Sequence, residues 1–150
     1  MINLGNAHES FGDSRQQKDL LERALIILEQ HYGKDHPEVA TTLANLGNAH
    51  GDLGDYRQKK DLLERALTIK EQHYGKDHPS VAKTLANLGV AHDSLGELRR
   101  AKELLERAFR IWVEHGSPYA EQAQRCLAQM EVKMMPSVRR SVQEPQPGKL

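Results

Sequence analysis

Cysteine, aromatic residues and long apolar runs are all scarce in this chain. One cysteine, Cys126, stands among 150 residues, which excludes an internal disulfide and a zinc site built from several thiolates. Aromatic residues make up only 5% of the chain, a composition that suits many thin contacts between helices better than one thick core. No apolar run approaches the roughly 20 residues of a membrane span, and the N-terminus lacks a signal-peptide pattern. We therefore expect a soluble, cytoplasmic protein with no membrane partner.

Neither sign of charge is in excess, because Lys+Arg and Asp+Glu number 21 each. Without a net positive field, the chain is not expected to bind nucleic acid. Catalytic motifs are missing as well: there is no G-x-S-x-G, no phosphate-binding glycine loop and no H-E-x-x-H. These absences favour a protein that is not an enzyme and that needs no cofactor.

What the sequence contains instead is a repeat. Residues 3–44 and 45–86 align without a gap and share 33 of 42 residues, and a third copy starts at Asn87. The hexapeptides NLGNAH, NLGNAH and NLGVAH begin at positions 3, 45 and 87, and LLERA recurs at 20, 62 and 104. A fixed period of this size predicts a solenoid in which each unit covers its neighbour.

Each unit is predicted to contain two helices. In residues 36–54, polar positions lie about 200° from an apolar helical face formed by Val39, Leu43, Leu46 and Leu53. Gly54 and Asp55 interrupt this pattern, and a second helix follows to about Tyr74. The expected fold is all-α, a solenoid of antiparallel helix pairs over residues 2–134. Its parts are units at about 1–35, 36–77 and 78–116, a capping helix at 117–134, and a disordered tail or linker at 135–150.

The heptapeptide HYGKDHP, found twice, is rich in groups that can bind a metal. His31 and His36 could share an ion, but no cysteine or carboxylate cluster completes the roughly four ligands that zinc needs. We favour a turn. Gly33 is expected to end one helix and Asp35 to be the N-cap of the next. Pro37 would then lie in the first turn, and Glu38 would complete a capping box. All eight histidines belong to columns at the repeat interval, as copied structural positions do, and we expect no metal site.

The segment TLANLGNAHGDLGDYRQKKDLLERALTIKEQHYGKDHPSVA carries a known pattern, marked by Leu43, Leu46, Gly47, Gly54, Tyr56, Leu63, Ala66 and Pro79. With its period of 42, it resembles the tetratricopeptide repeat, in the longer subtype found in kinesin light chains and nephrocystin-like proteins. The resemblance covers about residues 2–134. It implies a right-handed solenoid whose first helices line a concave groove that binds peptides or partner proteins, without catalysis.

One departure from the family concerns the crossing of the two helices within a unit. The family carries a small residue there in the second helix; Ala101 fits, whereas Gln17 and Lys59 stand at this place in the earlier copies. A long side chain must run out along the surface or push the helices apart. We therefore expect looser crossings in the first two units.

The polar face of the first helices is the expected binding site. Asparagines recur along it at the repeat interval: Asn3, Asn45 and Asn87, with Asn6 and Asn48 beside them. An amide side chain offers two donors and an acceptor, so this ladder can bind the backbone of an extended peptide. The resemblance supports this use, since related repeats carry an asparagine ladder at the matching position. The alternative is that the asparagines only fix contacts within the repeat.

Two cationic residues lie one repeat apart on the same face. Lys83 and Arg125, with Asn87 and Gln129 beside them, could receive an acidic peptide or a terminal carboxylate. This matches only in part the carboxylate-binding pattern of co-chaperone members of the family. A solvated charge is the simpler interpretation of either residue alone.

The N-terminal end of the solenoid is expected to lack a cap. Met1 aligns with Leu43, so the first helix lacks the residues matching 36–42. On the outer helices, Ile26 and Leu28 stand where the second copy has threonine and lysine. If exposed, they form an apolar patch suited to self-association as a homo-oligomer, or to an upstream repeat of a longer array.

Two single residues are expected to be structural. Trp112 stands in the third copy at the place of Leu28, and we expect it to pack under the last helix. Cys126 has no identifiable partner histidine and is expected to be an ordinary half-buried residue.

Overall fold

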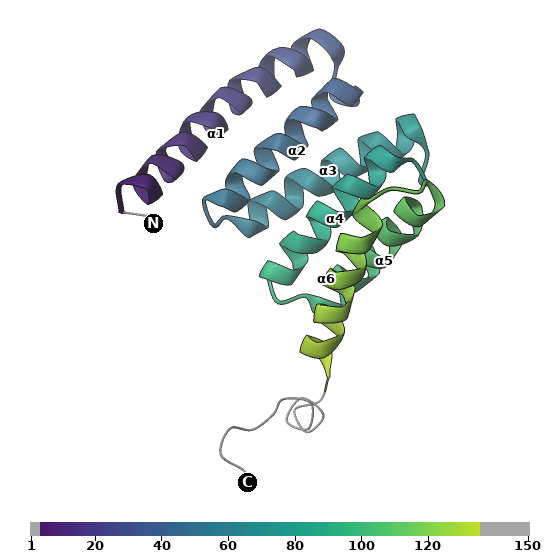
Figure 1. Ribbon diagram of the computed structural model, residues 1–150. Helices are drawn as coiled ribbons and strands as arrows, with labels where there is room; N and C mark the ends of the chain where they lie inside the picture. Colours follow the sequence, from purple (N-terminus) through teal and green to yellow (C-terminus); the bar gives the residue numbers. More distant parts are fainter. Residues whose placement is uncertain (1–3, 136–150) are drawn as a thin grey trace.

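The computed structural model describes residues 4–135, with side chains from Gly12 onward, and within them it contains six helices and no strand. The helices are α1 (Leu4–Tyr32), α2 (Pro37–Asp52), α3 (Tyr56–Tyr74), α4 (Pro79–Ser94), α5 (Leu98–Glu114) and α6 (Tyr119–Met134). Figure 1 shows them stacked in chain order as antiparallel neighbours. The predicted all-α solenoid is confirmed. The tail expected at 135–150 lies, after Met135, outside the described residues.

None of the described helices is both long and apolar enough to cross a membrane. Instead, the apolar faces of adjacent helices are buried against one another along the whole stack. One core runs from α2 to α6, and its fully buried large side chains include Leu43, Leu63, Ile69, Leu85, Leu88 and Ile111. Helices inside the stack bury residues against neighbours on both sides, which explains the wide apolar faces of α3 and α5.

Two ion pairs repeat with the period of the sequence and join successive second helices. Arg65 of α3 pairs with Glu29 of α1 at 2.9 Å, and Arg107 of α5 pairs with Glu71 of α3 at 3.4 Å. All four side chains are partly exposed, so each pair contributes at most about 1 kcal/mol. The pairs hold each second helix in the same register on the one before it.

The first helices α2 and α4 begin at the proline of the heptapeptide, and the residue just before the proline is the N-cap. The predicted cap, Asp35, is wrong: the Nδ1 atom of His36 accepts the hydrogen bond of the Glu38 backbone N–H at 3.1 Å. His78 caps α4 in the same way. A residue that precedes proline is held extended, here at φ −88° and ψ 144°, so His36 cannot itself be helical. Pro37 does lie in the first turn, as predicted.

The first copy forms one helix where two were predicted. Gly54 and Gly96 turn the chain between the helices of the second and third units at φ of 85° and 80°, whereas the matching Gly12 lies inside α1. Continuing the helix instead adds one backbone hydrogen bond for each residue ordered.

The helix crossing at Lys59 is as close as the one at Ala101. The stem of Lys59 runs over Gly51, where an added Cβ would lie 2.6 Å from the Lys59 Cδ, and burial lowers the pKa of the ammonium group. A Cβ added to Gly47 would lie 3.3 Å from the Lys59 carbonyl oxygen, and one added to Gly89 would lie 3.3 Å from that of Ala101. The looser crossing predicted for the second unit is therefore wrong, because a glycine opposite the lysine makes room for its stem.

Candidate functional site

The predicted binding residues belong to the first helices of the units. On α2, Asn45 is exposed and Asn48 is half-buried, and on α4, Asn87 is half-buried. Asn3 and the side chain of Asn6 lie outside the described part of the chain. Two of the three positions of the asparagine ladder can therefore be located, on neighbouring first helices, and peptide binding by the ladder stays a prediction.

Basic residues that could bind an acidic ligand lie on α3, α4 and α6. Lys83 is exposed on α4, and Arg125 and Gln129 are exposed on α6. Lys70 of α3, which the sequence placed on the outer face, is half-buried; burial lowers its pKa, and the charge of Lys83 lowers it further. Among the described residues, no carboxylate oxygen lies within 4.0 Å of either ammonium nitrogen. Two neighbouring cations without an acidic partner form a place for an anionic group.

A pocket of about 220 Å³ opens beside Lys83, between α4 and α6. Its walls come from these two helices and its floor from α5; it is lined by Lys83, Ala86, Asn87, Val90, Leu105, Trp112, Tyr119, Gln122, Ala123 and Cys126. Most of the lining is apolar, and Val90 remains 46% exposed at its edge. The pocket thus combines an apolar interior with an amide and an ammonium group at its opening.

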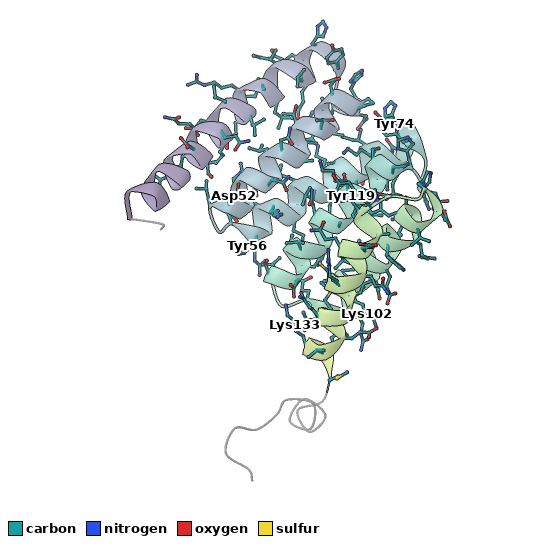
Figure 2. All side chains as sticks on the ribbon, viewed as in Figure 1. Asp52, Tyr56, Tyr74, Lys102, Tyr119 and Lys133 are labelled. Atoms are coloured by element: carbon teal, nitrogen blue, oxygen red, sulfur yellow. The ribbon has the colours of Figure 1, made fainter. Side chains whose placement is uncertain are left out.

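The floor of the pocket is aromatic. Trp112 is 8% exposed, and its ring centroid lies 5.5 Å from that of Tyr119, the residue labelled at the start of α6 in Figure 2. The prediction that Trp112 packs under the last helix is confirmed. Cys126 is half-buried, as predicted, and forms part of the lining. Sequence analysis missed the pocket, although the third copy's exchange of lysine for tryptophan at position 112 was a visible signal.

Two ion pairs at the far end of α6 anchor this wall of the pocket. Lys133 of α6 lies 3.2 Å from Asp93 of α4, and Lys102 of α5 lies 3.9 Å from Glu131 of α6. Figure 2 labels both lysines, on neighbouring helices near the C-terminal end of the stack. The two pairs bind α6 to both helices that it covers.

Two histidines, His73 and His92, contact the repeat framework. Nε2 of His73 lies 2.8 Å from the carbonyl oxygen of Asp35, which ties α3 to the turn before α2. His92 is buried, with its Nδ1 2.8 Å from a carboxylate oxygen of Glu97, and this hydrogen bond lowers the pKa of Glu97. Over the described residues, no group of three or more histidine, cysteine or acidic side chains could hold a metal ion. The heptapeptide is the turn between α1 and α2 and again between α3 and α4, as predicted.

The apolar patch predicted from Ile26 and Leu28 has a different composition. Ile26 is 59% exposed, but Leu28 is half-buried and packs against the core. Leu20 and Ile27, each 64% exposed, are aliphatic residues that accompany Ile26 on α1. Leu28 is covered because its position on a second helix faces the next first helix, as Trp112 does in the third copy.

Comparison with known proteins places the chain by its repeats. A tetratricopeptide-repeat model matches residues 1–38 and 39–80, and a second tetratricopeptide-repeat model matches residues 60–112. Comparison with curated proteins gives no significant match.

Solved structures agree on the fold. A Podosopora anserina protein described as a kinesin light chain with nearly identical TPR-like repeats aligns with a TM-score of 0.72 and 22% identity, over 88% of this chain and 68% of that one. A single-substitution variant of it gives the same values. BtubC (BKLC) from P. vanneervenii aligns with a TM-score of 0.63 and 19% identity, over 93% of this chain and 61% of that one. Because the first family model alone matches more than half of the residues, the chain belongs to the tetratricopeptide-repeat family.

Proposed function

We propose that this protein binds a peptide segment of a partner protein along the first helices α2, α4 and α6. Tetratricopeptide repeats generally mediate protein–protein interaction. The observation that carries the proposal is the pocket between α4 and α6, which has an apolar interior beside the ammonium group of Lys83. A folded surface with this combination suits a ligand that has one apolar side chain and one acidic group.

The size and chemistry of the pocket support a more specific proposal for the ligand. At about 220 Å³ it is smaller than the roughly 300–1,000 Å³ of sites for drug-sized molecules, and it suits one apolar side chain of a peptide. An acidic side chain or terminal carboxylate next to this anchor can bind Lys83, with Arg125 on the neighbouring helix. Asn45 and Asn87 can then bind the peptide backbone, whatever its sequence.

The proposal is for binding rather than catalysis, and for a protein ligand rather than nucleic acid or membrane. Balanced totals of 21 basic and 21 acidic residues give no field for nucleic acid. A single cysteine, half-buried in the pocket wall, is compatible with a reducing compartment, and we propose the cytoplasm as the place of action.

A peptide-display selection on the purified chain tests the proposal. We expect enriched peptides to share one apolar and one acidic residue, and to lose binding when Asn45→Ala and Asn87→Ala are combined. Val90→Asp places a charge at the edge of the pocket and should weaken binding at least about tenfold, since an unpaired charge near an apolar contact costs more than 1.4 kcal/mol.

Val113→Asp is the matched control, because Val113 is 54% exposed on α5 and does not line the pocket. It should leave peptide binding unchanged. Absence of any enriched peptide from a folded, helical protein contradicts the proposal, and equal losses from both aspartate variants exclude the pocket as the binding site.

Self-association through the N-terminal end is a second candidate function, supported by one observation. Leu20, Ile26 and Ile27 expose 64%, 59% and 64% of their surface on a single helix, α1. Such a cluster is typical of a contact surface. Leu20→Lys combined with Ile27→Lys should convert an oligomer to monomers in sedimentation equilibrium, and a wild-type chain that is monomeric at all concentrations excludes this function.

A further inference from the structure

The face of α1 that carries Leu20 is open to solvent, although the same face is covered in the other copies. Leu20 is 64% exposed, whereas Leu62 and Leu104 are 9% and 2% exposed. All three are the first leucine of the LLERA motif. A position that is core in two copies and exposed in the third indicates that α1 lacks a neighbour which α3 and α5 have.

The other copies show which segment covers this face. In the second unit, a Cβ added to Gly47 of α2 would lie 3.5 Å from the Cβ of Leu62. In the third unit, a Cβ added to Gly89 of α4 would lie 3.7 Å from the Cβ of Leu104. Both glycines end an NLG motif on an antiparallel first helix. The matching NLG motif of the first copy is at residues 3–5.

This segment cannot reach Leu20 of its own chain while α1 is continuous. Gly5 and Leu20 both belong to the helix Leu4–Tyr32, and at 1.5 Å per residue they are about 22 Å apart along its axis. Gly12, whose counterpart Gly54 turns the chain at a φ of 85°, is helical. Figure 1 shows the result: α1 runs on past the end of α2 as one rod. The antiparallel pairing seen between α2 and α3 is therefore not made inside the first copy.

We propose that two copies of this chain exchange the segment, so that residues 4–11 of each α1 lie antiparallel across Leu20 of the other. This inference rests on the self-association proposed above and names its geometry at Leu20; Ile26 and Ile27 lie beyond the stretch that residues 4–11 of the other copy would cover. The midpoint between Gly5 and Leu20 falls between Gly12 and Asp13. A two-fold axis through that point brings Gly5 of each copy onto Leu20 of the other at the same time, which makes the interface self-complementary and closed.

Between Gly5 and Leu20, the exchanged pairing needs no contact that the other copies do not already make. It repeats the pairing of α2 with α3 and of α4 with α5, with the same residues at the closest approach. Only the backbone at Gly12 differs, since it is helical in the exchanged form and turned in a form that folds back on itself. Exchange of an identical element with a change at one hinge is an economical route to a dimer.

A pair of introduced cysteines distinguishes exchange from folding back. Gly5→Cys and Leu20→Cys are combined with Cys126→Thr, threonine being the residue that the preceding copy has there. The matching Cβ–Cβ separation of 3.5 Å lies at the short end of the roughly 3.5–4.5 Å found in disulfides. Gly47→Cys with Leu62→Cys, in the same background, is the control and should form a bond within one chain.

We expect non-reducing electrophoresis and intact-mass measurement to show dimers joined through positions 5 and 20. The chain without added cysteines should sediment as a dimer. A bond between positions 5 and 20 of the same chain overturns the exchange, because it requires a turn at Gly12. A dimer by sedimentation that forms no such bond overturns the exchange and leaves self-association standing, whereas a monomer overturns both.

Gly12→Ala gives a second readout. Alanine favours the helix and disfavours the left-handed turn that folding back needs, so the dimer should tighten at least about fivefold. Inserting Gly-Gly-Ser after Gly12 should have the opposite effect and yield monomers. If neither variant shifts the dimer dissociation constant, the hinge at Gly12 does not control association and the exchange is refuted.

Discussion

Three leucines at the same position of the three copies are expected to contribute very differently to stability. Leu20, Leu62 and Leu104 are 64%, 9% and 2% exposed. Truncation to alanine removes three carbon groups, each worth about 0.8 kcal/mol when buried. A residual cavity raises the loss to about 3 kcal/mol in a well-packed site. We therefore expect Leu62→Ala and Leu104→Ala to lower the free energy of unfolding by about 3 kcal/mol each.

Leu20→Ala should cost less than about 1 kcal/mol in the monomer, because only about a third of the residue is out of water and no cavity forms. Urea unfolding followed by far-ultraviolet circular dichroism measures all three variants, at protein concentrations where the chain is monomeric and with the m-value checked for constancy. Gln72→Ala, on the exposed face of α3, is a control that should change little. Equal losses from Leu20→Ala and Leu104→Ala in the monomer would refute the reasoning, since they would mean that α1 is covered within its own chain.

Three further substitutions test other features. A double-mutant cycle on Arg65→Ala and Glu29→Ala should give a coupling of about 0.2–1 kcal/mol in urea unfolding, and zero coupling contradicts the 2.9 Å ion pair. Gly54→Ala should destabilise by about 1 kcal/mol in thermal or urea unfolding, because alanine is strained at a φ of 85° although the space is open; no loss contradicts the turn. The hydrogen bond from His92 depresses the pKa of Glu97 below its ordinary 4.5, so its contribution is present above that pH and is lost as the pH falls further. Urea unfolding between pH 6 and about pH 3 should therefore show a steeper loss for the wild type than for Glu97→Gln, and parallel profiles contradict the hydrogen bond.

Much of the fold follows from the repeat itself. Apolar residues at helical spacing and a glycine at each joint predict α2 to α5, because a copied unit places the same turn at Gly54 and Gly96. The turn predicted from the same letters at Gly12 is not formed, because a turn needs a partner helix to pack against it. Local sequence specifies which conformations are open to Gly12, but packing selects among them.

The candidate site could be predicted only in part. Lys83 and Asn87 were found because their helix has one polar face, which helical periodicity reveals. Lys70 was assigned to the outside, because a second helix in a stack contacts two neighbours and periodicity cannot say which flank is covered. The pocket also depends on where α6 lies against α4 and α5, and no pattern within a single repeat contains that information.

The ion pairs from Arg65 to Glu29 and from Arg107 to Glu71 bear on how such a gene can lengthen. The first two copies carry both the arginine that reaches back and the glutamate that receives the next arginine, whereas the third carries Arg107 but has Val113 in place of the glutamate. A duplication of the 42 codons of either of these two copies therefore supplies both the arginine and the glutamate of a further ion pair, wherever within the period its end points fall. Recombination in the DNA needs no alignment with the protein's helices, and the inserted segment still meets matching surfaces on both sides.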